Sequence, residues 1–84
     1  MLRVLYFASV REVMGVGEEL VSPPPDVATV EALADWLSLR SDAHRRALAD
    51  RARLRAAVDQ AFVGLDAPIA GAREVALFPP VTGG

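Results

Sequence analysis

Cysteine and lysine are both absent from this chain of 84 residues, and histidine, tryptophan and tyrosine each occur once. The lack of cysteine excludes disulfides, thiolate metal sites and a persulfide carried on a side chain. The lack of lysine excludes Schiff-base chemistry, because all nine basic residues are arginines. A covalently bound group, if the protein carries one, therefore has to sit elsewhere than on a thiol or an amine.

Long apolar runs are also missing. No segment approaches the roughly 18 apolar residues that a membrane span needs, and Arg3 and Arg11 are not followed by the apolar core of a signal peptide. We therefore expect a cytoplasmic protein without a membrane partner. The apolar fraction of 52% and the charged fraction of 24% are typical of a globular protein, and the length predicts a single domain over residues 1–84.

Apolar, β-branched and aromatic residues predict strands at both ends of the chain. The first, residues 2–8, is apolar at both parities and is expected to be buried on both faces. It should form a hairpin with the second through the glycine-containing turn at 13–17. The triple proline 23–25 ends that hairpin, because proline cannot donate to a ladder. The predicted strands are 2–8, 18–21, 57–58, 61–63 and 74–78.

Two helices are predicted between these groups of strands. Thr29 is a suitable N-cap for a helix through about Leu39, with apolar residues at the i, i+3, i+4, i+7 spacing of one face. Ser41 or Asp42 could cap a shorter helix through about Ala49. The resulting order predicts an α+β fold, the β-grasp (ubiquitin-like) roll, with a mixed five-stranded sheet packed on one main helix plus a short second helix.

Side chains that could do chemistry are few. His44 is the only histidine, and we interpret it as a solvated surface residue, because no orienting carboxylate or fellow ligand is evident near it in the sequence. A metal site is not expected, because the sequence offers too few suitable ligands. Gly15 and Gly17 fit a hairpin turn better than a phosphate-binding loop, since a strand rather than a helix follows them. The four serines stand at predicted strand ends or helix caps, which argues against a nucleophile and base pair.

Six of the nine arginines fall between residues 40 and 55, where the only acidic residues are Asp42 and Asp50. Binding to a phosphate backbone is conceivable. The chain as a whole carries a net charge of −2, however, and no aromatic residues alternate with these arginines to stack on bases. We therefore expect no nucleic-acid partner, and interpret the segment as a solvated helix face or a rim that meets an acidic partner.

The three phenylalanines, Phe7, Phe62 and Phe78, each lie on or beside a predicted strand. Helices can cover only one face of the sheet. If the residues of the opposite parity face the helices, Phe7 and Phe78 must face away, by the two-residue period of strands. An exposed aromatic patch on so small a domain is typical of a protein interface.

The end of the chain offers a different kind of reactive group. Pro79 and Pro80 stop the last strand, so residues 79–84 should leave the sheet as an extended tail that ends in Gly83 and Gly84. Frayed ends are common, and small residues there need mean nothing. A carboxylate without nearby side chains, however, can enter a narrow channel of another enzyme and attack the α-phosphate of ATP. A sulfur donor that displaces AMP would then leave a thiocarboxylate on Gly84.

Nearly the whole chain resembles the family of molybdopterin synthase small subunits, which are sulfur carriers. The most specific match is the block from Glu74 to Gly84, EVALFPPVTGG. The supporting matches are VLYFA at 4–8 followed by VRE at 10–12, TVEAL at 29–33 and AAVDQ at 56–60. The triple proline, the arginine-rich segment and Asp59, where asparagine is familiar, depart from the family pattern.

The resemblance implies a β-grasp fold without a tightly bound cofactor. Gly84 would be adenylylated by an E1-like adenylyltransferase that uses ATP, and a sulfurtransferase would supply the sulfur. The tail, including Val81, Thr82 and Gly83, would then enter the large synthase subunit, in a heterotetramer of two small and two large subunits. The thiocarboxylate would give sulfur to cyclic pyranopterin monophosphate, and the catalytic side chains are expected on the large subunit.

The resemblance also assigns the partner-binding residues. Phe7, Phe62 and Phe78 match positions that meet the partner surface, and Arg11 matches a position near it. Pro79 and Pro80 begin the segment that enters the partner. Three alternatives stay open: a sulfur carrier for thiamine synthesis or tRNA thiolation, a ubiquitin-like protein modifier joined through Gly84, and a binding module with an inert tail.

Overall fold

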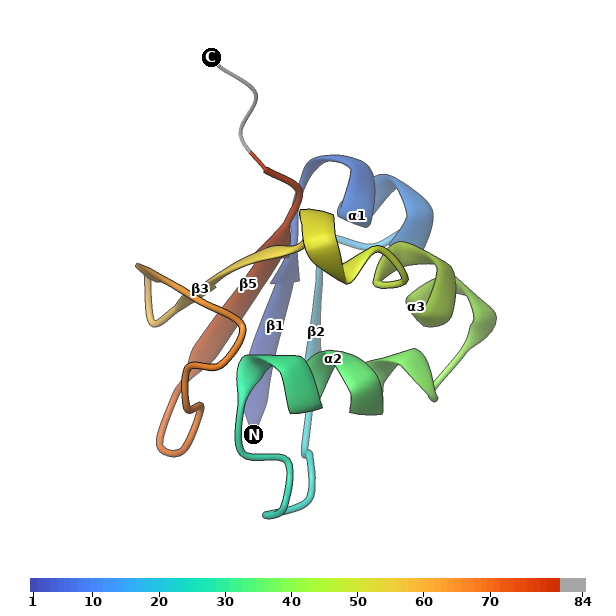
Figure 1. Cartoon of the computed structure of the whole chain (residues 1–84). Coiled ribbons are helices and arrows are strands. Elements are labelled where there is room, and N and C mark those ends of the chain that lie inside the picture. The colour runs from blue at the N-terminus through green and yellow to red at the C-terminus, as the bar shows by residue number, and fades with distance from the viewer. Residues whose placement is uncertain (81–84) are drawn as a thin grey trace.

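A computed structural model describes residues 1–80 of the chain as a sheet with helices against one face (Figure 1). The strands are β1 (Leu2–Tyr6), β2 (Glu18–Val21), β3 (Arg55–Val58), β4 (Ala61–Val63) and β5 (Glu74–Phe78). The helices are α1 (Ala8–Met14), α2 (Val30–Ser38), α3 (Asp42–Ala47) and the short 3-10 turn η1 (Arg51–Arg53).

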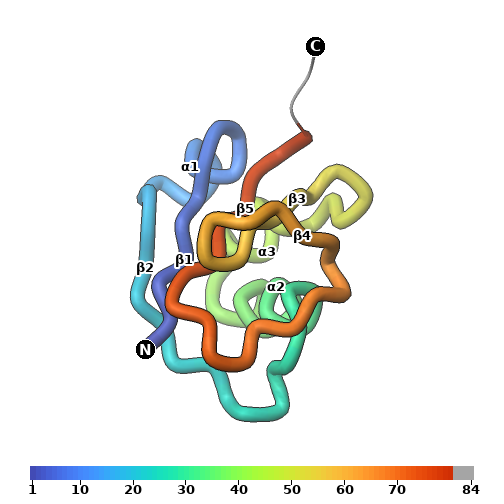
Figure 2. The backbone as a smooth tube through the Cα atoms, turned by 90° about the vertical axis from the view of Figure 1, so that its left-hand side faces the viewer, coloured from blue at the N-terminus to red at the C-terminus, as the bar shows by residue number. Residues whose placement is uncertain are grey.

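The five strands form one sheet in the order β2-β1-β5-β3-β4. The central pair, β1 and β5, is parallel, and every other pair is antiparallel, so the sheet is mixed. Figure 2 shows the strands in front with α2 and α3 behind them. This arrangement confirms the predicted α+β, ubiquitin-like β-grasp fold. Because the helices lie on one side, the other face of the sheet is left open.

Both predicted helix caps are present. The Thr29 hydroxyl accepts a hydrogen bond from the amide of Ala32, at 3.1 Å, and Ser41 accepts one from the amide of His44. Each bond satisfies one of the free amides of a first helical turn. The α2 residues on the predicted apolar face are fully buried: Val30, Leu33, Ala34 and Leu37. These side chains form the centre of the core.

The connection between β1 and β2 differs from the prediction. The two strands pair as expected, with Leu2 opposite Val21, but the seven-residue helix α1 replaces the tight hairpin turn. Val10 is only 5% exposed and anchors this helix to the core, and Gly15, with φ +80°, ends it in the left-handed conformation. A helix this short depends on tertiary packing, which local sequence patterns do not reveal.

The first strand is also less buried than predicted. Leu2, Val4 and Tyr6 are in the core, whereas Arg3 is exposed and Leu5 is only partly covered. The prediction of burial on both faces was wrong because no helix covers the second face. The strand alternates between a buried and an open side, as strands of a one-sided sheet do.

The turn between β3 and β4 is built on two residues with positive φ, Asp59 at 47° and Gln60 at 73°. This conformation joins two antiparallel strands with the twist that they require. Asp59 Oδ1 also accepts hydrogen bonds from the amides of Arg73 and Glu74, at 2.9 and 3.0 Å. The side chain of Asp59 therefore ties this hairpin to the start of β5.

Candidate functional site

The open face of the sheet carries a continuous row of apolar side chains. The strand register places Leu5 beside Ala76, Ala76 beside Ala57, and Ala57 beside Phe62. Residues paired in this way point to the same side of a sheet. The two alanines are small, so the middle of the row lies lower than its ends and forms a floor.

Aromatic side chains enclose this floor. The rings of Phe62 and Phe78 meet edge to face with their centroids 5.8 Å apart, and Phe7 stands on the β1 side. We call the resulting hollow, of about 800 Å³, the aromatic groove. Its floor is Leu5, Ala57 and Ala76, its apolar walls are Phe7, Phe62, Phe78, Pro79 and Pro80, and its remaining lining residues are Ala8, Ser9, Arg53, Gln60 and Glu74.

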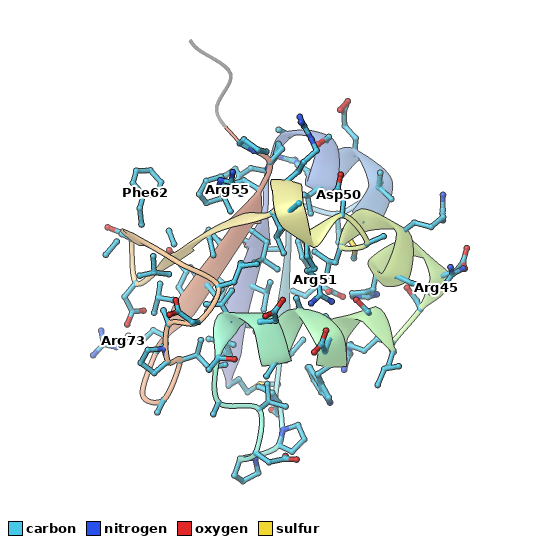
Figure 3. The ribbon with its side chains drawn as sticks, in the orientation of Figure 1. Arg45, Asp50, Arg51, Arg55, Phe62 and Arg73 are labelled. Atoms are coloured by element: carbon cyan, nitrogen blue, oxygen red, sulfur yellow. The ribbon has the colours of Figure 1, made fainter. Side chains whose placement is uncertain are left out.

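The phenylalanines lie where the alternation of the strands predicts. Phe62 is 83% exposed and Phe7 is 46% exposed, while Val75 and Leu77, of the opposite parity in β5, are fully buried. Exposed aromatic rings are costly to hydrate, and a cluster of them is typical of a protein interface. Figure 3 shows Phe62 projecting from the sheet beside Arg55.

The tail begins at the aromatic groove. Pro79 and Pro80 follow β5 directly, belong to neither a helix nor a strand, and line the groove. The predicted site residues Val81, Thr82, Gly83 and Gly84 lie outside the described residues. The aromatic groove therefore adjoins the first two residues of the predicted tail.

Arg11 is the one predicted partner-binding residue of the described chain that does not line the aromatic groove. It lies on α1 with its guanidinium against Gly17, where a Cβ atom would come within 3.2 Å of Arg11 Cζ. Gly17 thus leaves room for this side chain. The predicted contact of Arg11 with a partner stays a prediction.

The interpretation of His44 as a solvated surface residue was wrong. His44 is 7% exposed, and its Nε2 lies 2.7 Å from Glu19 Oε1, while its Nδ1 lies 2.7 Å from the Ser41 hydroxyl. The hydroxyl of the fully buried Tyr6 donates to the same Glu19 oxygen at 2.6 Å. Two signals were available: Ser41 caps the helix three residues before His44, and Glu19 shares the inward parity of Val21 in β2.

This buried polar cluster, formed by Tyr6, Glu19, Ser41 and His44, has clear electrostatic consequences. Burial, together with the hydrogen bond to Glu19, raises the pKa of the Tyr6 phenol far above its ordinary value. Burial by itself would raise the pKa of Glu19, but the hydrogen bonds from Tyr6 and His44 outweigh it and hold that pKa below its ordinary value. The cluster joins β1, β2 and α3, and so acts in the core rather than at the groove.

Sequence reasoning missed the floor of the groove and its polar residue Gln60, and it grouped Arg53 with the other arginines of residues 40–55 instead of placing it beside the phenylalanines. Leu5, Ala57 and Ala76 come together only through the register of three strands, β1, β5 and β3, which no local pattern specifies. Within residues 1–80, the helices are all too short or too polar to cross a lipid bilayer.

Comparison with known proteins gives consistent matches over the full chain. A family model described as the ThiS family matches residues 4–84. The chain is 46% identical to the molybdopterin synthase sulfur carrier subunit of Escherichia coli and 38% identical to that of Haemophilus influenzae, over all of both chains in each case. Among solved structures, SAMP1 from Haloferax volcanii matches with a TM-score of 0.71 and 30% identity, over 99% of this chain and 98% of that one.

Proposed function

The chain belongs to the ThiS family, and on that premise we propose that it is the sulfur carrier subunit of a molybdopterin synthase, with the sulfur held on Gly84. The observation that carries the proposal is the aromatic groove. It is an open apolar surface that leads directly into Pro79 and Pro80 at the base of the tail. In a chain without cysteine or lysine, a docking surface next to a side-chain-free end favours chemistry at that end.

The proposed chemistry begins at the Gly84 carboxylate. In the active site of an E1-like adenylyltransferase, a carboxylate oxygen attacks the α-phosphorus of ATP, and pyrophosphate leaves. Sulfur at the sulfide level, which a sulfurtransferase delivers with a thiol as reductant, then attacks the acyl carbon of the adenylate, AMP leaves, and Gly84 becomes a thiocarboxylate. Gly83 and Gly84 carry no side chains, so the tail can approach a buried phosphate closely. ATP is therefore a substrate of the partner and not a cofactor of this chain.

The second half of the proposed reaction takes place in the large synthase subunit. The thiocarboxylate sulfur displaces an oxygen substituent on a carbon of cyclic pyranopterin monophosphate, and water then cleaves the acyl–sulfur bond and restores the Gly84 carboxylate. Two such transfers complete the dithiolene of molybdopterin. A heterotetramer of two small and two large subunits would hold the carriers at the active sites. The catalytic side chains belong to the large subunit, and the contribution of this chain is a nucleophile on a positioned tail.

The aromatic groove supplies that positioning. Phe7, Phe62 and Phe78 lose their exposed apolar surface when a partner covers the groove, which favours association by roughly 25 cal/mol for each Å² buried. Pro79 and Pro80 have fixed φ angles and no amide donors, so the chain cannot continue the hydrogen-bonded ladder of β5 through them. Docking at the groove thereby directs the tail toward the partner's active site.

Mass spectrometry of the intact protein tests this proposal. Incubation with the adenylyltransferase, ATP and a sulfurtransferase with its sulfur source should add the mass difference between one sulfur atom and one oxygen atom. Addition of the large subunit and the pterin substrate should then return the original mass as product forms. If the mass never changes in the presence of all components, the proposal is wrong.

The alternative functions give different results in the same system. A sulfur carrier for thiamine synthesis or tRNA thiolation would gain sulfur but would not bind the large synthase subunit. A protein modifier would form isopeptide adducts with lysines of other proteins. An inert binding module would form no adenylate.

A further inference from the structure

The arginines between residues 40 and 55 separate into two groups in the folded protein. Arg51 pairs with Asp35 at 2.7 Å, and Arg45 and Arg46 both pair with Asp42. Arg40 lies over the ring of Trp36, 5.0 Å from its centroid. These four side chains have partners on α2 and α3, or beside them, and therefore need none from another protein.

Arg53 and Arg55 form the second group. Within residues 1–80, neither guanidinium lies within 4.0 Å of a carboxylate, and both residues are exposed. Arg53 lines the aromatic groove, and Arg55 stands directly opposite Phe78 in the pairing of β3 with β5. The two arginines thus lie along the groove close to the base of the tail. Figure 3 shows Arg55 on the side of Phe62, with Arg45 on the far side of the molecule.

The guanidinium of Arg55 is held in place by the backbone of the residues just before it. Its Nη1 atom donates to the carbonyl oxygens of Ala52 and Leu54, each at 3.0 Å. Within the described part of the chain, Nε and Nη2 have no acceptor. A fixed guanidinium with free donors is suited to binding a planar carboxylate through two hydrogen bonds.

A partner that covers the aromatic groove would also remove water from these arginines. Arg55, Phe62 and Phe78 line one smaller hollow at the edge of the groove, so a surface seated on the rings reaches the guanidinium as well. Loss of water from an unpaired charge is costly unless the partner supplies acceptors of opposite charge. The neighbourhood of the groove therefore selects for an acidic surface.

We propose that Arg53 and Arg55 form a cationic rim on this chain. The rim pairs with carboxylates of the adenylyltransferase beside the channel that receives the tail, and it speeds association with that enzyme. The inference rests on the proposed function and adds the charge of the partner surface to it. The alternative ligand, a phosphate backbone, is disfavoured because a rim of two arginines offers few phosphate contacts and the chain carries a net charge of −2. The first partner in the proposed cycle is the adenylyltransferase, so the rim is tested there.

The experiment measures association of the full chain with the adenylyltransferase by stopped flow over a series of salt concentrations. The double variant Arg53→Gln, Arg55→Gln should associate about five- to tenfold more slowly at low salt, and the difference should shrink as salt screens the charges. The double variant Arg53→Lys, Arg55→Lys keeps both charges and should recover most of the rate. Thermal unfolding of each variant verifies that it is folded.

The matched control is Arg45→Gln, Arg46→Gln, which changes the net charge by the same amount on α3. It should associate at the wild-type rate. Equal slowing of both glutamine variants would overturn the rim, because net charge alone would then explain the effect. The rim is also wrong if Arg53→Gln, Arg55→Gln associates normally while Phe62→Ala weakens binding, since the groove would then dock without it.

Three further results overturn the rim. If Arg53→Gln, Arg55→Gln loses binding to a single-stranded RNA oligonucleotide and keeps the wild-type association rate with the adenylyltransferase, the arginines bind a phosphate backbone instead. If the wild-type chain neither binds the adenylyltransferase nor gains sulfur, the proposed function fails and the rim fails with it. Sulfur gain with an unchanged association rate in the glutamine variant removes the rim alone.

Discussion

His44 Nε2 and Glu19 Oε1 lie 2.7 Å apart in the layer between the sheet and the helices, and the Tyr6 hydroxyl donates to the same carboxylate oxygen. One carboxylate oxygen of Glu19, on β2, thereby binds the side chains of Tyr6 on β1 and His44 on α3. Such a shared acceptor ties together three elements that are distant in sequence. Since the contacts are buried or nearly so, their loss should be felt in stability rather than in partner binding.

The first prediction concerns acid stability. The ordinary pKa of Glu19 is 4.5, and its pKa in the folded protein is lower. A lowered folded-state pKa means that the ionised group contributes stability above pH 4.5 and that this contribution is lost as the pH falls through the folded-state pKa. At pH 7 the free energy of unfolding of Glu19→Gln should be about 1–2 kcal/mol smaller than that of the wild-type protein. On acidification the variant should lose less of this free energy than the wild type does. Urea unfolding between pH 7 and pH 3 measures both effects.

The matched control for this prediction is the neighbouring Glu18→Gln. Glu18 pairs with Arg3 at 3.7 Å between two exposed side chains, and such pairs contribute little. The stability of Glu18→Gln should depend on pH in the same way as that of the wild-type protein. A wild-type pH slope in Glu19→Gln would show that the buried polar cluster does not depend on ionised Glu19.

The second prediction separates docking from folding at Phe62. Because its side chain is 83% exposed, Phe62→Ala should change the free energy of unfolding by no more than about 0.5 kcal/mol. The same change removes a wall of the aromatic groove and should weaken partner binding by at least tenfold, as loss of a central interface aromatic does. Calorimetric titration with the large synthase subunit measures this binding.

Leu39→Ala is the control for Phe62→Ala. Leu39 is equally exposed, at 86%, and follows α2 outside the aromatic groove. Its replacement should leave both stability and binding unchanged. Equal loss of binding in the two variants would mean that general surface hydrophobicity, and not the groove, holds the partner.

The third prediction concerns the turn at Asp59. Its Oδ1 accepts two backbone hydrogen bonds, from Arg73 and Glu74, so Asp59→Ala leaves two amides without that acceptor and should cost about 1–2 kcal/mol. Asp59→Asn keeps an acceptor oxygen and tolerates the positive φ of 47°, and should cost markedly less. Chemical denaturation of the two variants provides the comparison. If the two variants lose the same free energy of unfolding, the negative charge of Asp59, and not its acceptor oxygen, stabilises the turn.

The fourth prediction concerns the end of the tail. Deletion of Gly84 should abolish the sulfur-dependent mass gain, because the carboxylate would then stand one residue short of the partner's reactive centre. The apolar core is built from residues between Leu2 and Leu77, so the melting temperature should not change. Gly84→Ala should also fold normally but react more slowly, since its Cβ enters the channel. Wild-type mass gain in the deletion variant would exclude Gly84 as the sulfur carrier.

Local patterns were sufficient for much of the fold. The apolar periodicity of residues 30–37, capped by Thr29, predicted α2, and the prolines after Phe78 marked the end of β5 at the residue where it ends. Strand alternation predicted that Phe7 and Phe78 point outward if the residues of the opposite parity face the helices, and Val4, Tyr6, Val75 and Leu77 are buried as that condition requires. These features depend on neighbours within a few residues, where helix and strand periods and proline geometry act directly.

Contacts between distant segments decided the rest. The sequence alone determined the order of most elements and a side-chain-free end. Tertiary structure decided that residues 8–14 form a helix, because burial of Val10 stabilises a segment too short to be helical by itself. It buried His44 against Glu19, 25 residues away in the chain. It also paired Arg51 with Asp35, whereas Arg53 and Arg55 have no carboxylate partner among residues 1–80. Charge and hydrogen-bond partners depend on distances in space, and only the folded chain sets those.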